Sequence, residues 1–167
     1  MKYKLLVLDI DGTVTNSKKE VTEKTKNAIL DLQKRGIPVA IASGRAPQGI
    51  YSVAKALELD KFGSYIMPFN GARIVNFQTG ECIYSKTLPL HLPARLWKDA
   101  VENGIGIVTY DEKEVIAGTK PDKYTLLEAK IASMPIAYHE DFNTYVDFPV
   151  NKCLMTGEPE DLEALEP

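Results

Sequence analysis

The sequence has little of what builds disulfide-rich or metal-stapled proteins. Its two cysteines, Cys82 and Cys153, are too few and too far apart for a disulfide framework. Its two histidines, His91 and His139, share no metal-ligand spacing with them. We therefore expect a reduced, cytoplasmic protein in which both histidines are surface or capping residues.

Long apolar runs and basic clusters are missing as well. No stretch reaches the roughly 20 apolar residues that span a bilayer. Asp9 interrupts the N-terminal apolar run before a signal-peptide core could form. The 20 basic and 23 acidic residues give a net charge of -3 with no Lys/Arg-rich run, which argues against nucleic acid or an anionic membrane as a partner. The oligomeric state cannot be read from these features.

What is present is an ordinary globular composition, with 44% apolar residues in 167. The first half alternates expected strands and helices. Apolar runs predict strands at residues 5–8, 37–42 and 65–67, the first of them covered on both faces of a parallel sheet. Thr22 is the expected N-cap of one intervening helix, and Pro47 fits the first turn of the other. This order is typical of a doubly wound α/β sheet.

The pattern of expected elements changes after about residue 72. Residues 74–77 and 82–84 predict a hairpin with Gly80 at its turn. A separate α/β unit follows from residue 86, so we divide the chain into 1–85 and 86–167. Its expected elements are a helix around 96–101 with Trp97 in the core, strands at 105–110, 114–117 and 152–155, a helix at 122–133, and the start of a helix at Pro159.

The residues that carry chemistry stand at the end of the first expected strand, in "KLLVLDIDGTVTN". Because strand residues two apart project to one side, Asp9 and Asp11 can face one point at the carboxyl end of the sheet, where α/β proteins bind ligands. Two adjacent carboxylates repel unless a cation joins them, and hard oxygen ligands favour Mg²⁺. One carboxylate could act as a nucleophile and the other could move a proton. Gly12 and Thr13 add backbone amides and a hydroxyl that suit a phosphate.

Each motif also has a plainer explanation. An Asp-Gly pair is a common turn, a Ser-Gly such as Ser43-Gly44 at a strand end is usually a turn or cap, and Asn70-Gly71 is a frequent turn signal. The order of the aspartates and Ser43 along successive strands favours function over these explanations.

"DIDGT" after an apolar strand, followed one strand later by "SGR", resembles the haloacid dehalogenase superfamily of phosphotransferases. "FNGA" at residues 69–72, the hairpin and the second α/β unit resemble its Cof-type branch, which consists of Mg²⁺-dependent phosphatases with a large cap inserted after the third strand. The resemblance covers the whole chain, is strong in residues 1–85 and is only architectural beyond them. It implies an α/β fold with a partial Rossmann-like parallel-sheet core at 1–85 and part of a C2-type α/β cap at 86–167.

The resemblance also implies roles for matching residues. Asp9 would attack phosphorus and Asp11 would protonate the leaving alcohol, while the Asp9 side chain and the Asp11 backbone carbonyl ligate Mg²⁺. The remaining expected contacts are to the phosphoryl group or the rest of the substrate: Gly12, Thr13, Ser43, Gly44, Arg45 and Asn70. The expected substrate is a small phosphorylated metabolite, with sugar phosphates as the leading class.

The sequence also departs from the family. The family's later lysine and its Gly-Asp-x-x-x-Asp motif follow the cap, and neither occurs here; the surroundings of Lys152 predict a cap strand, so we do not transfer the lysine role to it. We therefore expect an incomplete fragment, cut within the cap, that is weakly active or inactive alone. Two alternatives stay open, a non-catalytic module that binds phosphorylated ligands and a phosphomutase.

Overall fold

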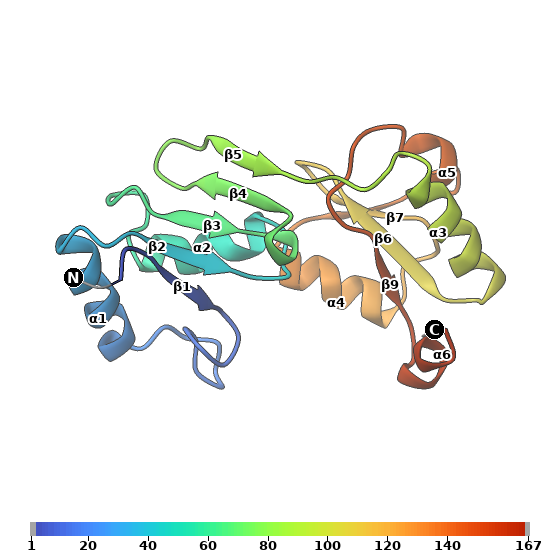
Figure 1. Cartoon of the computed structure of the whole chain (residues 1–167). Coiled ribbons are helices and arrows are strands. Elements are labelled where there is room, and N and C mark those ends of the chain that lie inside the picture. The colour runs from blue at the N-terminus through green and yellow to red at the C-terminus, as the bar shows by residue number, and fades with distance from the viewer. Residues whose placement is uncertain (1–2, 166–167) are drawn as a thin grey trace. The chain divides into compact units, whose positions relative to one another are not determined.

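The computed structural model describes residues 3–165, and the chain divides into two compact units, up to Ser85 and from Lys86 (Figure 1). The first unit contains β1 (Leu6–Asp9), α1 (Glu23–Lys34), β2 (Val39–Ala42), α2 (Gln48–Ala56), β3 (Tyr65–Met67), the short 3₁₀ helix η1 (Phe69–Gly71), β4 (Arg73–Asn76) and β5 (Cys82–Ser85). The second contains α3 (Leu92–Glu102), β6 (Gly106–Tyr110), β7 (Val115–Ala117), α4 (Lys123–Ala132), β8 (Ile136–Tyr138), α5 (Phe142–Tyr145), β9 (Leu154–Thr156) and α6 (Pro159–Glu163). No helix among residues 3–165 is long and apolar enough to cross a bilayer.

The first unit is a five-stranded sheet in the order β1-β2-β3-β4-β5. β1, β2 and β3 are parallel, whereas β4 and β5 form the predicted antiparallel hairpin, with Gly80 at φ +76°. The α/β class is confirmed. Within the described residues the strand order advances in one direction from β1, so this part of the chain holds one wing of a Rossmann-like sheet.

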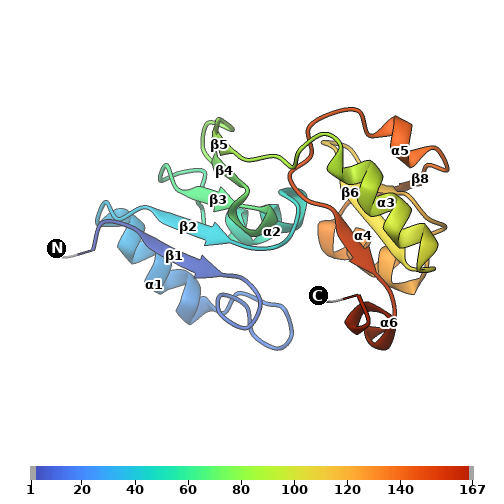
Figure 2. The same ribbon diagram turned by 45° about the vertical axis from the view of Figure 1, so that its right-hand side comes forward.

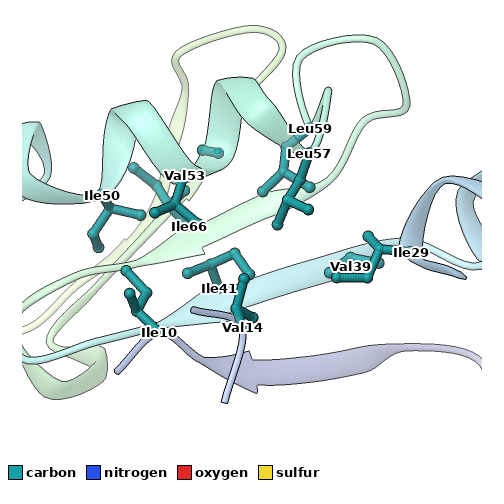
Figure 3. Packing of buried hydrophobic residues seen from close by; sticks show 11 residues of the cluster. Ile10, Val14, Ile29, Val39, Ile41, Ile50, Val53, Leu57, Leu59 and Ile66 are labelled. Carbon is teal, nitrogen blue, oxygen red and sulfur yellow. The ribbon is translucent and has the colours of Figure 1, made fainter. Parts of the chain in front are cut away.

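Both helices of the first unit pack on the same face of the sheet. Ile29 of α1 and Ile50 and Val53 of α2 join one buried cluster with Val39 and Ile41 of β2 (Figure 3). This follows from the right-handed crossovers between strands that advance in one direction, which place successive helices on one side. The α1 helix begins as predicted, with the Thr22 side chain accepting a hydrogen bond from the amide of Thr25.

The prediction that the first strand is covered on both faces is wrong. Leu6 and Leu8 pack against the cluster, but Val7 is 48% exposed and Leu5, just before the strand, is 47% exposed. Among residues 3–165, β1 pairs with β2 alone and both helices pack on the other face, so nothing in the described part of the chain covers Val7.

The second unit is a four-stranded sheet in the order β8-β7-β6-β9. All residues of β6 and β7 are buried, because α3 and α5 cover one face of the sheet and α4 covers the other (Figure 2). Trp97 of α3 packs against the cluster formed by α3, α5 and the sheet, and its indole Nε1 donates to the carbonyl oxygen of Gly118 at 2.8 Å. Trp97 is half-buried, so it lies at the margin of the core to which it was assigned.

Two elements of the second unit were not predicted, β8 and α5. β8 has three residues and α5 has four, too few for either periodicity to show. The strand expected at 152–155 is β9 at Leu154–Thr156, two residues later in its start. The α4 helix lies where expected, and Asp122 and Thr125 form a capping box at its start.

Candidate active site

The turn after β1 contains the two aspartates, one on each side of the buried residue Ile10. Asp9 ends the strand and is exposed, whereas Ile10 is fully buried. The carbonyl oxygen of Ile10 accepts hydrogen bonds from the amides of Val14 and Thr15, at 3.1 and 3.0 Å, and from the Thr15 hydroxyl at 2.9 Å. This turn holds Asp9 and Asp11 at the carboxyl end of the sheet, where the sequence predicted them.

Gly12 and Thr13 follow in the same turn. Gly12 has φ +80°, a conformation that glycine adopts without strain. Thr13 donates its amide to the Ile10 carbonyl at 3.4 Å and lines a groove of about 500 Å³ between β1 and α1. The geometry thus places Gly12 with the aspartates and brings Thr13 toward the α1 side of the sheet.

Asp11 is the electrostatic centre of the site. Nη2 of Arg45 lies 2.8 and 2.9 Å from its two carboxylate oxygens, and Nζ of Lys19 lies 2.8 Å from Oδ1. The hydrogen bond from Lys19, together with the hydrogen bond and charge of Arg45, lowers the pKa of Asp11 below its usual value and outweighs the opposing effect of burial. Among residues 3–165, no side chain donates to the Asp9 carboxylate, so the two aspartates have different surroundings.

Ser43 follows β2 directly and belongs to a loop that hydrogen bonds hold against β3 and η1. Its side chain is nearly buried, and its Oγ accepts a hydrogen bond from the amide of Arg45 at 3.3 Å. The loop is tied to the next strand because the amide of Ser43 donates to the Met67 carbonyl and the amide of Asn70 donates to the Ser43 carbonyl, both at 3.0 Å. β1 and β2 are neighbours, so Ser43 and Arg45 stand at the same edge of the sheet as Asp9.

Asn70 and Gly44 form a close pair. A Cβ atom at Gly44 would lie 2.7 Å from Oδ1 of Asn70, a distance that no ordinary contact allows. Asn70 has φ 57°, the left-handed conformation that asparagine tolerates better than most residues. The structure therefore supports a bracing role for Asn70 under the loop that contains Ser43; its predicted contact with substrate stays a prediction.

Lys19 is the site residue that the sequence did not reveal. It lies in the polar segment "NSKKE", which predicts only a loop. The loop returns to the site because Thr15 bridges to both Asp11 and Val21. Asn16, a frequent turn residue, was the local signal in the sequence, but it does not indicate which group the lysine contacts.

The predicted Mg²⁺ can be tested against the donors on hand. Residues 3–165 contain no cluster of three or more His, Cys, Asp or Glu side chains suited to a metal ion. Mg²⁺ is commonly held by one or two protein oxygens, with water and substrate phosphate completing its shell. The Asp9 carboxylate and the Asp11 backbone carbonyl fit that pattern, and the Asp11 side chain is already engaged by cations.

Three comparisons place the chain among known proteins. A haloacid dehalogenase-like hydrolase from Bacteroides thetaiotaomicron has a solved structure that is 38% identical, with a TM-score of 0.90 over 99% of this chain and 62% of that chain. Phosphatase YwpJ of Bacillus subtilis is 31% identical over 85 residues, which cover 51% of this chain and 28% of its own length. The structure of the subclass IIB sugar phosphatase BT4131 is 18% identical with a TM-score of 0.74, covers 97% of this chain and 62% of that chain, and shows a shared fold.

The chain spans about 60% of the length of the first curated relatives that it matches. The sequence pattern of the haloacid dehalogenase-like hydrolase family matches residues 6–167. The chain therefore belongs to the haloacid dehalogenase-like hydrolases, as the "DIDGT" and "SGR" motifs predicted.

Proposed function

We propose that the protein is a phosphatase that hydrolyses small phosphate monoesters, sugar phosphates among them, through a phosphorylated aspartate. The observation that carries the proposal is the gathering of Asp9, Asp11, Ser43 and Arg45 at the carboxyl ends of two adjacent parallel strands. The similarity to YwpJ, a phosphatase, and to BT4131, a sugar phosphatase, supports the same reaction class.

Asp9 is the proposed nucleophile. Its carboxylate oxygen forms a bond to phosphorus while the bond from phosphorus to the alcohol oxygen breaks, which leaves an aspartyl phosphate. Asp9 suits this role because it is exposed and, among the described residues, no side chain competes for its oxygens. Arg45, Ser43 and the turn amide of Gly12 would hold the phosphoryl oxygens, and such positioning and charge neutralisation are the main protein contributions to phosphoryl transfer.

Asp11 is the proposed acid and base. It gives a proton to the leaving alcohol in the first step, and in the second it takes a proton from the water that attacks phosphorus. The second step breaks the bond between phosphorus and Asp9, releases inorganic phosphate and restores both carboxyl groups. Lys19 and Arg45 lower the pKa of Asp11 in the free site, which suits its role as base; for the role of acid, the two cations must move off the Asp11 carboxylate when substrate binds.

Mg²⁺ is part of the proposal. The Asp9 carboxylate and the Asp11 backbone carbonyl would hold it, and when bound it would neutralise charge on the phosphoryl oxygens. The chain's own residues supply the nucleophile, the proton carrier and the cationic contacts.

The test is release of inorganic phosphate from a panel of phosphate esters with Mg²⁺, measured for the full-length protein and its Asp9→Asn and Asp11→Asn variants. We expect the Asp9→Asn variant to release none above background, because an amide cannot form the covalent intermediate. Phosphate release that survives in Asp9→Asn contradicts the nucleophile assignment. Transfer of the phosphoryl group to a second sugar hydroxyl in place of water would identify a phosphomutase.

A further inference from the structure

Two cations share the single carboxylate of Asp11. Arg45 contacts both oxygens through Nη2, and Lys19 contacts Oδ1 through Nζ, all at 2.8–2.9 Å. Since one carboxylate faces two cations, these three side chains alone carry one excess positive charge, and the Asp9 carboxylate stands outside their contacts. Arginine binds carboxylates and phosphates with the same geometry, so a phosphate oxygen can replace a carboxylate oxygen on this pair of cations.

The backbone holds Lys19 in place. Its φ of 63° is unusual for a residue with a side chain, and the turn that imposes it is well bonded. The amide of Lys19 donates to the Asn16 carbonyl at 2.9 Å, and Oδ1 of Asn16 accepts from the amides of Lys18 and Glu20 at 2.9 and 3.0 Å. The asparagine turn therefore directs Lys19, and not its neighbour Lys18, onto Asp11.

Arg45 is anchored but not saturated. Its Nη1 donates to the Gly49 carbonyl at 3.1 Å, which ties the guanidinium to the first turn of α2. Its Nε is buried and has no acceptor among the residues that the structure describes. Buried donors usually have a partner, so the guanidinium keeps hydrogen-bonding capacity that the protein does not use.

We propose that Lys19 and Arg45 form an anion site for the substrate's phosphate group, in which the Asp11 carboxylate is a competing internal ligand. Phosphate oxygens take over the two cations, and the Asp11 carboxyl group is released toward the leaving-group oxygen. Lys19 thereby becomes a substrate-binding residue, in addition to the residues that the family motifs indicate. The inference rests on the proposed function, because it concerns the same phosphoryl group.

Competition between Asp11 and phosphate gives the inference a signature that a surface ion pair lacks. If Asp11 competes with phosphate, Asp11→Asn frees both cations and strengthens phosphate binding. The loss of Lys19 should then weaken binding more in the Asp11→Asn background than in the wild type, because the lysine is no longer shared. Groups that interact through one ligand are non-additive in this way, whereas independent groups are additive.

The experiment measures the dissociation constant of inorganic phosphate by calorimetry, with Mg²⁺ present, for the full chain and its variants. We expect Asp11→Asn to bind about tenfold tighter than wild type. Lys19→Met should weaken binding about tenfold in the Asp11→Asn background and only about twofold in the wild type, since Asp11 already occupies the lysine in the wild type. Lys18→Met is the matched control and should bind phosphate as the wild type does, because the Lys18 side chain has no contact with Asp11.

Two further variants guard the interpretation. Lys19→Arg should retain the charge and most of the affinity, and Lys19→Gly removes the side chain at a φ that glycine favours, so a loss of binding there does not arise from misfolding. Equal phosphate affinities for Lys19→Met and Lys18→Met in both backgrounds overturn the role of Lys19 while leaving the proposed phosphatase intact. If neither the wild type nor Asp11→Asn binds phosphate, the proposed function itself is contradicted and the inference falls with it.

Discussion

Gly118→Ala is expected to disrupt the second unit, because the new methyl group has no room. A Cβ atom at Gly118 would lie 2.7 Å from Cδ1 of Trp97 and 2.7 and 2.8 Å from Cγ and Cδ2 of Phe142. Phe142 is fully buried, so its ring cannot turn into solvent. The backbone of Gly118 is not in the left-handed region, so the effect of the substitution comes from packing.

The magnitude follows from two losses. Overpacking a dense core costs about 1–3 kcal/mol, and displacing Trp97 breaks its hydrogen bond to the Gly118 carbonyl, worth about 1 kcal/mol. With a urea dependence of about 1 kcal/mol/M for a small unit, the midpoint of unfolding should fall by about 2–4 M. Since small domains have only about 5–15 kcal/mol of stability, such a loss is a large share of what holds the unit folded.

The assay is urea unfolding followed by the fluorescence of Trp97, the only tryptophan in the sequence, whose indole contacts residue 118. Gly157→Ala is the matched control, because its backbone is also outside the left-handed region and its Cβ would meet Cγ2 of Ile105 at 3.3 Å. We expect its midpoint to stay near that of the wild type. A Gly118→Ala midpoint no lower than that of Gly157→Ala would refute the packing argument.

The other predictions concern buried polar groups. Burial raises the pKa of Cys153 to about 11, so at pH 8 a thiol reagent should label the exposed Cys82 and leave Cys153 unmodified in the folded chain, as peptide mass mapping would show. The folded state holds the Cys153 proton more tightly than the unfolded state does. The stability that the protonated thiol contributes is therefore complete below about pH 9 and is lost as the pH rises toward 11. In thermal unfolding, the Cys153→Ala variant should lose less stability over this pH range than the wild type does. Ser64→Ala should lower the free energy of unfolding by about 1–3 kcal/mol in denaturant titrations, because the Ser64 hydroxyl donates to Gln33 at 2.7 Å and accepts from the amide of Val39 at 3.0 Å in a buried site; a loss below about 0.5 kcal/mol would show that the network is not needed.

The sequence predicted most of the helices and strands, because caps, turns and apolar spacing are set by residues close together in the chain. Thr22 caps α1, as predicted, and Asp122, the predicted first residue of the next long helix, caps α4. The strand predicted at 65–67 has the bounds of β3. The haloacid dehalogenase resemblance is confirmed by the family match. The elements that escaped, β8 and α5, are too short for their periodicity to be read from the sequence.

What the sequence did not show depends on contacts between distant segments. The exposure of Val7 is decided by strand order, which an apolar run does not encode. The aspartates, Ser43 and Arg45 were predicted because their motifs follow the ends of two successive strands, and the structure brings them to one edge of the sheet. The contact of Lys19 with Asp11 and the close approach of Asn70 to Gly44 depend on the path of loops that join distant segments. No residue pattern predicts the distances between those side chains.

The exposed face of β1 carries an apolar side chain beside the proposed nucleophile. In the described part of the chain that face presents Val7 and Asp9, which are two residues apart and about 6.6 Å from each other along the strand. Charged side chains, lysine above all, are a common means of reducing aggregation at exposed strands. A lysine at position 7 would place a cation beside the proposed nucleophile, at a Coulomb energy of about 0.6 kcal/mol even in bulk water. Engineering of this chain for solubility should therefore leave Val7 unchanged and alter exposed apolar residues away from β1.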